Sequence, residues 1–272
     1  PLPEEEESWS ELEVMFSTAK GNVRRNLLSD FSNVKSNGKI AMKLDEDDQL
    51  IGVQICTEAS DVLLVAKGGK CIRFRATDVR LFKGRDSSGV RGMRLAKGDS
   101  VIGMSILNHV EVDTETRDAY LKSRRSVDET GTVAEYADGI TPELYEELYK
   151  QEEVLLAITV NGYGKRTNAY EYRVTNRGGQ GIINIETSNR NGDVIATFPI
   201  TDDEQIMLVT NGGKLIRTPV TDIRIAGRNT QGVTLFKTAK DEQVVSVTAL
   251  ADAKSDEEDA EGDELAGDDE NG

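Results

Sequence analysis

The stretch "GKCIRFRATDV", residues 69–79, decides the fold, because its pattern occurs three more times along the chain. The related stretches are "GNVRRNLLSDF" (21–31), "GYGKRTNAYEY" (162–172) and "GKLIRTPVTDI" (213–223). Each contains a glycine, an arginine four positions later and an acidic residue five positions after that. Self-similarity of this kind is the sequence signature of a repeat architecture. The arginines are Arg25, Arg73, Arg166 and Arg217, and the acids are Asp30, Asp78, Glu171 and Asp222.

Each repeat also has an apolar run before the arginine, such as "DVLLVA" (61–66), and a glycine-bearing loop after the acid, such as "KGRDSSGV" (83–90). The repeated glycines are 48 residues apart from Gly21 to Gly69 and 51 apart from Gly162 to Gly213. A pitch of about 50 with four short β runs is typical of four-stranded blades in a propeller-like array. The sequence therefore predicts an all-β fold with blade repeats over 12–59, 60–107, 154–203 and 204–250.

The interval between Gly69 and Gly162 is 93 residues, which leaves room for an insertion over 108–153. The segment "TPELYEELYKQEE" (141–153) predicts a helix with Thr141 as its N-cap and Pro142 in its first turn. The segment "DTETRDAYLKSRR" (113–125) predicts a second helix. We therefore expect an acidic helical insertion between the second and third blades.

The formal net charge of −16 is unevenly distributed. Residues 1–13 carry −6, residues 251–272 carry −10 and the insertion carries −8, so the repeats themselves carry +8. We expect an acidic leader over 1–11 and a disordered acidic tail over 251–272. A basic body with acidic appendages is compatible with a nucleic-acid partner.

Other functional classes are poorly supported by the sequence. His109 is the only histidine, and Cys56 and Cys71 lack metal-type spacing, so we expect no metal site and reduced thiols in a cytoplasmic protein. No GxSxG or HExxH motif occurs, and we expect no catalytic residue. No apolar run approaches the roughly 20 residues of a membrane span, so we expect no membrane partner.

Alternation along a strand would place Arg73 and Arg75 on the face opposite Ile72 and Phe74. The repeated arginines would then form an outward basic band; alternatively, each pairs with the acid five positions later and is structural. Further basic residues lie in or beside the glycine-bearing loops, where they could approach DNA phosphates. The candidate DNA-binding residues are Lys20, Arg24, Arg25, Lys35, Lys39, Lys70, Arg73, Arg75, Lys83, Arg85, Arg91, Lys165, Arg166, Arg177, Gly178, Gly179, Gly181, Lys214, Arg217 and Arg228.

The loop "NRGGQG" (176–181) invites comparison with a nucleotide-binding loop. It lacks the GxxxxGK[ST] pattern and a strand–loop–helix context, and related loops occupy the same place in other repeats. We therefore interpret it as one of several equivalent blade loops and expect its ligand to be the DNA backbone.

Three long segments carry a family resemblance: "NGKIAMKLDEDDQLIGV" (37–53), "NGYGKRTNAYEY" (161–172) and "GGKLIRTPVTDIRIAGRNTQGVTLFKTAKDEQVVSV" (212–247). Over 12–107 and 154–250 the chain resembles the C-terminal domain of bacterial DNA gyrase A. The resemblance implies a β-pinwheel, in which neighbouring blades exchange a strand and double-stranded DNA wraps around a basic outer rim. It also implies an accessory domain of an ATP-dependent type II topoisomerase that introduces negative supercoils.

The partners implied are DNA, the rest of gyrase A and gyrase B, with ATP and Mg belonging to the holoenzyme. No cofactor is expected in this chain, and the isolated domain is expected to be monomeric, cytoplasmic and associated with the nucleoid. A close alternative is the equivalent domain of the topoisomerase IV A protein. A propeller scaffold for protein partners is a third reading, although the Trp-Asp repeat ending typical of WD40 scaffolds is absent.

The family's hallmark is the box Gln-Arg-Arg-Gly-Gly-Lys-Gly in its first blade, and the closest match here is "TNRGGQG" (175–181). Arg177, Gly178, Gly179 and Gly181 match that box, whereas its first, second and sixth positions differ. The family usually has about six blades, so we expect two blades to precede the four repeats seen here.

Overall fold

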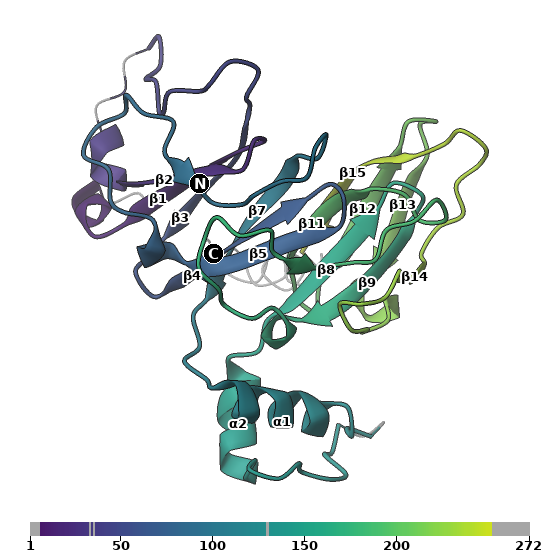
Figure 1. Cartoon of the computed structure of the whole chain (residues 1–272). Helices are drawn as coiled ribbons and strands as arrows, with labels where there is room; N and C mark the ends of the chain where they lie inside the picture. Colours follow the sequence, from purple (N-terminus) through teal and green to yellow (C-terminus); the bar gives the residue numbers. More distant parts are fainter. Residues whose placement is uncertain (1–5, 33, 35, 129–130, 252–272) are drawn as a thin grey trace, which may run out of the picture.

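The computed structural model describes residues 6–32, 34, 36–128 and 131–251 of the 272-residue chain (Figure 1). Antiparallel sheets, one for each repeat, account for most of it. Blade 1 contains β1 (Glu13–Thr18), β2 (Asn22–Leu27) and β3 (Leu50–Cys56), and blade 2 contains β4 (Ser60–Ala66), β5 (Lys70–Arg75) and β7 (Val101–Asn108). Blade 3 contains β8 (Val154–Thr159), β9 (Tyr163–Asn168) and β11 (Val194–Ile200), and blade 4 contains β12 (Gln205–Thr210), β13 (Leu215–Pro219) and β15 (Val244–Leu250).

Neighbouring repeats exchange a short strand. The sheet of blade 1 is completed by β6 (Val90–Arg91), that of blade 2 by β10 (Ile182–Ile183) and that of blade 3 by β14 (Val233–Thr234), each supplied by the following repeat. This exchange confirms the predicted all-β pinwheel. In the described part of the chain the fourth sheet has three strands, because no described repeat follows it to supply another.

The loop glycines make this exchange possible. Gly181 has a φ of +74°, and a Cβ at this position would lie 2.1 Å from the carbonyl oxygen of Cys71 in β5. A Cβ at Gly89 would likewise lie 2.2 Å from the carbonyl oxygen of Val23 in β2. A side chain at either position would therefore force the exchanged strand away from the blade it completes.

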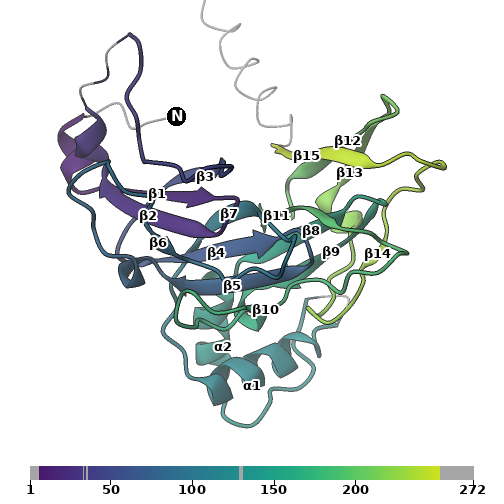
Figure 2. The ribbon, with the colours of Figure 1, turned by 45° about the horizontal axis from the view of Figure 1, so that its top comes forward.

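The core lies between blades. Val62 and Leu64 of β4 pack towards blade 1, whereas the alternating Leu63 and Val65 pack towards blade 3. Both faces of such a strand are buried, which is why "VLLVA" (62–66) is continuously apolar rather than alternating. Inner strands β3, β7, β11 and β15 contact one another in sequence, and the blades follow an arc (Figure 2).

Both predicted helices of the insertion are confirmed, as α1 (Thr114–Arg124) and α2 (Pro142–Lys150). The α2 N-cap is Thr141, as expected, and its hydroxyl accepts from the backbone of Leu144. The helices project beyond the ends of the strands of blades 2 and 3 (Figure 1). Tyr120 packs against Tyr170 of blade 3 with ring centroids 5.1 Å apart, which docks the insertion on the array.

Short 3-10 turns complete the described structure. The predicted acidic leader includes η1 (Glu6–Ser10), whose Trp9 is buried against blade 1 beside Phe16 and Leu28. The predicted tail lies outside the described residues apart from Ala251. No helix in the described part of the chain is long and apolar enough to cross a membrane. The other turns are η2 (Leu28–Phe31), η3 (Ala76–Asp78), η4 (Ala169–Glu171) and η5 (Val220–Asp222).

Candidate nucleic-acid interface

Three of the four repeated arginines are buried, so the outward band predicted from strand alternation is wrong for them. Arg25, Arg73 and Arg166 are each 6% exposed. Arg25 pairs with Glu13 at 2.9 Å, Arg73 pairs with Asp61 at 2.8 Å, and Arg166 pairs with Asp202.

The alternative pairing with the acid five positions later is also wrong for these three arginines, because their partners lie elsewhere. Only Arg217, in blade 4, is exposed, and it donates to Gln205 at 2.6 Å.

The backbone explains this burial. Arg25, Arg73 and Arg166 each form a parallel bridge to the chain of the next repeat, at Leu81, Val174 and Ile225 respectively. The repeated arginine therefore lies at the junction between two blades. The guanidinium groups of Arg73 and Arg166 donate to backbone carbonyls there.

For Arg73, one Nη donates to the carbonyl of Ala169 at 3.0 Å and the other to that of Asn108 at 2.9 Å. These contacts make Arg73 a connector between blades.

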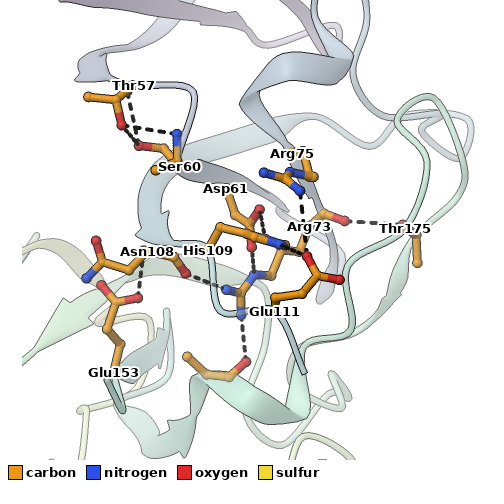
Figure 3. A network of polar contacts seen from close by, with 12 residues as sticks. Thr57, Ser60, Asp61, Arg73, Arg75, Asn108, His109, Glu111, Glu153 and Thr175 are labelled. Carbon is orange, nitrogen blue, oxygen red and sulfur yellow. Dashed lines mark hydrogen bonds and ion pairs between the residues drawn. The ribbon is translucent and has the colours of Figure 1, made fainter. Parts of the chain in front are cut away.

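Arg73 belongs to a polar network at the base of the insertion (Figure 3). Asp61 is fully buried and accepts from Arg73 Nε, while its other oxygen lies 2.9 Å from Nδ1 of His109. Nε2 of His109 lies 3.0 Å from Glu111, and this hydrogen bond lowers the pKa of the Glu111 carboxyl. Glu153 accepts from the backbone of Asn108, and burial raises the pKa of Glu153. The network ties the first and last residues of the insertion to blade 2.

Arg24 and Lys165, two further predicted DNA contacts, point into the molecule. Arg24 Nη1 donates to the carbonyl of Ser87 at 2.6 Å. Lys165 Nζ donates to the carbonyls of Gly227 and Arg228 at 2.7 and 2.6 Å, and burial lowers the pKa of Lys165 to about 8. Each side chain therefore holds the glycine-bearing loop of the following repeat.

The loop arginines link consecutive loops. Nη1 of Arg85, Arg177 and Arg228 donates to the carbonyls of Ile40, Arg91 and Ile183, at 2.6, 3.0 and 2.7 Å. Each acceptor lies in the equivalent position of the preceding loop. These three arginines are partly exposed, so the side of each guanidinium that faces away from the carbonyl can meet solvent or a ligand.

The remaining predicted residues are mostly at the surface. Lys39 donates to the carbonyl of Asp30 at 2.8 Å, and Lys214 pairs with Glu242 at 2.8 Å, so both have internal partners. Lys35 lies outside the described residues. The exposed members are Lys20, Lys70, Lys83, Arg91, Gly179 and Lys214, and the partly exposed members are Lys39, Arg75, Gly178 and Gly181.

A second repeated set of arginines was missed by the sequence reasoning. Arg80, Arg173 and Arg224 are exposed, and each lies two positions after the repeated acid. The signal was present as a fixed spacing of seven residues from Arg73, Arg166 and Arg217. Each of these arginines directly precedes a bridge residue, namely Leu81, Val174 or Ile225. An exposed basic band therefore follows the blade junctions, seven residues along the chain from the arginines that were predicted to form it.

The chemistry available to this surface is recognition of anions. Guanidinium groups form paired hydrogen bonds with phosphate oxygens, and repeated phosphate contacts position a duplex without reading its sequence. Within the described residues, no group of three or more His, Cys, Asp or Glu side chains is arranged to hold a metal ion.

Comparisons with known proteins agree with this architecture. A family model described as DNA gyrase C-terminal domain, beta-propeller, matches residues 12–57, 60–108, 153–201 and 204–251. The DNA gyrase A protein of Granulibacter bethesdensis is 48% identical over 275 residues, covering 94% of this chain and 29% of the relative. The DNA gyrase A protein of Rickettsia prowazekii is 46% identical over 267 residues, covering 96% of this chain and 30% of the relative. The chain thus spans about a third or less of these relatives.

Two solved structures share the fold. A DNA gyrase A C-terminal domain aligns with a TM-score of 0.65 at 23% identity, covering 89% of this chain and 66% of that one. The C-terminal domain of a DNA topoisomerase IV aligns with a TM-score of 0.69 at 18% identity, covering 94% and 68%. The four matched repeats, together with alignments to DNA gyrase A relatives over nearly the whole chain, identify it as a member of the DNA gyrase C-terminal domain family.

Proposed function

We propose that the chain binds duplex DNA through its phosphates and bends it around the outer side of the blades. The observation that carries this proposal is the exposure of Arg80, Arg173 and Arg224, one beside each blade junction or its equivalent. Because the blades follow an arc (Figure 2), a duplex in contact with successive junctions has to curve.

The family membership extends the proposal to the whole enzyme. As part of a gyrase A protein, the chain would be an accessory wrapping domain of an ATP-dependent type II topoisomerase. The DNA bend would determine the direction of strand passage and so favour negative supercoils. Its partners would be DNA, the rest of gyrase A and gyrase B, in the cytoplasm beside the nucleoid, with ATP and Mg used elsewhere in the holoenzyme.

The test is binding to a duplex of about 40 base pairs over a salt series. Replacing Arg80 and Arg224 with alanine removes two phosphate contacts, and the slope of log K against log salt should become shallower by about 1.8, from 0.9 per contact. The matched control replaces Lys122 and Lys150, two exposed lysines of the insertion helices, with alanine. If the unaltered chain shows no salt-sensitive binding, or both variants have the same slope, the proposal fails.

Bending requires a separate readout. A nicked plasmid ligated in the presence of a chain that bends DNA with a fixed hand should have a shifted linking number. Binding without any shift in linking number would mean that the chain binds DNA but does not wrap it.

The acidic tail can be tested in the same way. Residues 251–272 carry −10 and can compete with phosphates for the exposed arginines. A chain ending at Ala251 should therefore bind DNA more tightly at low salt. Unchanged affinity would mean that the tail does not reach the basic surface.

A further inference from the structure

A pocket of about 410 Å³ lies between blade 2, blade 3 and the start of the insertion. Its lining comes from three parts of the chain that are far apart in sequence, namely the end of β5, the start of the insertion from His109 to Arg117, and the segment from Tyr170 to Val174. We call it the insertion pocket. Its lining includes Arg75, His109, Glu111, Arg117, Arg173 and Val174.

Three arginines of the insertion pocket retain unused donors. Arg75 has a buried Nε without a hydrogen-bond partner, and its Nη1 is 3.8 Å from Glu111, beyond hydrogen-bond distance. No residue that the structure describes accepts a hydrogen bond from Arg173, which is exposed. Arg117 donates to Asp118 on its own helix at 2.8 Å, which fixes one side of the guanidinium. The pocket therefore offers N–H groups beyond those that face Glu111 and Asp118, chiefly on Arg173 and on the Nη atoms of Arg75 and Arg117.

The acids in and near the pocket offset only part of its positive charge. Asp61 is internal and already paired with Arg73. The Glu111 side chain is 89% exposed and bonded to His109, and that of Asp118 is 63% exposed.

We propose that the insertion pocket binds one backbone phosphate of duplex DNA, with Arg117 supplying a contact from the insertion and Arg75 and Arg173 supplying contacts from the blades. This inference rests on the proposed function, since it adds a contact to the same DNA path. Paired guanidinium–phosphate hydrogen bonds use the donors that the fold leaves open. Val174 beside them gives an apolar surface that suits a deoxyribose.

This assignment gives the insertion a role in DNA binding despite its net charge of −8. Four of its five basic residues lie within 117–125, in or next to α1. Arg124 is bonded to Glu152 within the insertion, and Arg125 is 3.5 Å from Glu171 of blade 3, so both are engaged in holding the insertion. Arg117 is the arginine of this group that reaches the insertion pocket.

The decisive comparison is Arg117→Ala against Lys122→Ala. Both remove one positive charge from α1, but Lys122 does not line the pocket. We expect Arg117→Ala to make the salt slope shallower by up to about 0.9 and to weaken binding by up to roughly eightfold at about 0.1 M salt, the values for complete loss of one phosphate contact. Lys122→Ala should leave the slope unchanged. Thermal unfolding of both variants shows that they are folded, and Arg117→Gln repeats the test with a side chain of similar reach.

A second variant examines whether the arginines share one phosphate. If they do, combining Arg117→Ala with Arg173→Ala should weaken binding less than the product of the single effects. Equal slopes for Arg117→Ala, Arg117→Gln and Lys122→Ala, with the unaltered chain still binding, would overturn the pocket and leave the DNA-binding proposal intact. Loss of salt-sensitive binding in the unaltered chain itself would overturn both. If inorganic phosphate at millimolar concentration protects Arg117 from an arginine-modifying reagent but does not affect DNA binding, the pocket binds a free anion. That result would also reject the inference.

Discussion

Replacing Arg73 with alanine should destabilise the fold far more than replacing Arg217, although the two arginines occupy the same position of the repeat. Arg73 is 6% exposed and makes three internal contacts, to Asp61, Ala169 and Asn108. Arg217 is exposed and bonds to a side-chain amide. The pair of variants therefore separates a structural arginine from a surface one within a single motif.

The magnitude follows from what Arg73→Ala leaves behind. Asp61 remains fully buried with His109 as its one remaining side-chain hydrogen-bond partner among the described residues, and two carbonyls lose a donor. Removing one partner of a buried ion pair costs about 3–5 kcal/mol. At about 2–4 °C per kcal/mol for a domain of this size, the unfolding midpoint should fall by roughly 6–20 °C.

Urea and thermal unfolding followed by circular dichroism measure this effect. Arg217→Ala, the matched control, should change the free energy of unfolding by less than about 1 kcal/mol, as surface substitutions do. Equal stabilities for the two variants would refute the structural role of Arg73. So would a loss of DNA affinity in Arg73→Ala at unchanged stability, because that result would place its guanidinium on the DNA surface.

Other perturbations test the strand exchange, the burial of the two thiols and the loss of stability at acid pH. Gly181→Ala should destabilise the fold much more than Gly213→Ala in urea unfolding, because both glycines have positive φ but only Gly181 meets backbone, at 2.1 Å from Cys71 O; equal losses would reject the close approach. A thiol reagent at pH 8 should label neither Cys56 nor Cys71 until the chain is unfolded, since burial raises the pKa of each to about 12. Hydrogen bonds from Lys214, Ala239 and Thr210 lower the pKa of Glu242 to about 2 from 4.5, so its contribution to stability is present above pH 4.5 and is lost as the pH falls towards 2. The stability difference between the unaltered chain and Glu242→Gln should therefore shrink over that range, and a constant difference would contradict the assignment.

The repeats, their pitch and both insertion helices could be predicted from sequence because each depends on local signals. Glycines at fixed spacing mark the turns, and Thr141 followed by Pro142 marks a helix start. The exchanged strands are only two residues long, which is too short for any periodicity to show. The exchanged strands of this chain could be predicted from the family resemblance alone.

The orientation of the repeated arginines was mispredicted for a physical reason. Alternation identifies an outward face only when one face of a sheet meets solvent. In this array the central strand of an inner blade packs against a neighbour on both faces, as Leu63 and Leu64 of β4 show. An arginine on either face of such a strand then meets another blade, and its exposure depends on whether that blade follows. Arg217, in the blade with no described successor, is the one of the four that is exposed.

The same geometry determines where DNA contacts can arise. If strand faces are interior, the exposed surface of the array lies along the segments that run from one repeat back to the preceding blade, and Arg80, Arg173 and Arg224 lie in those segments. The chain next to each of these arginines is held to the preceding blade by a backbone bridge: Arg25–Leu81, Arg73–Val174 and Arg166–Ile225. The spacing of phosphate contacts is therefore fixed by how one blade packs on another. A substitution buried between blades, with no access to DNA, should change the curvature of a bound duplex while leaving the number of phosphate contacts unchanged.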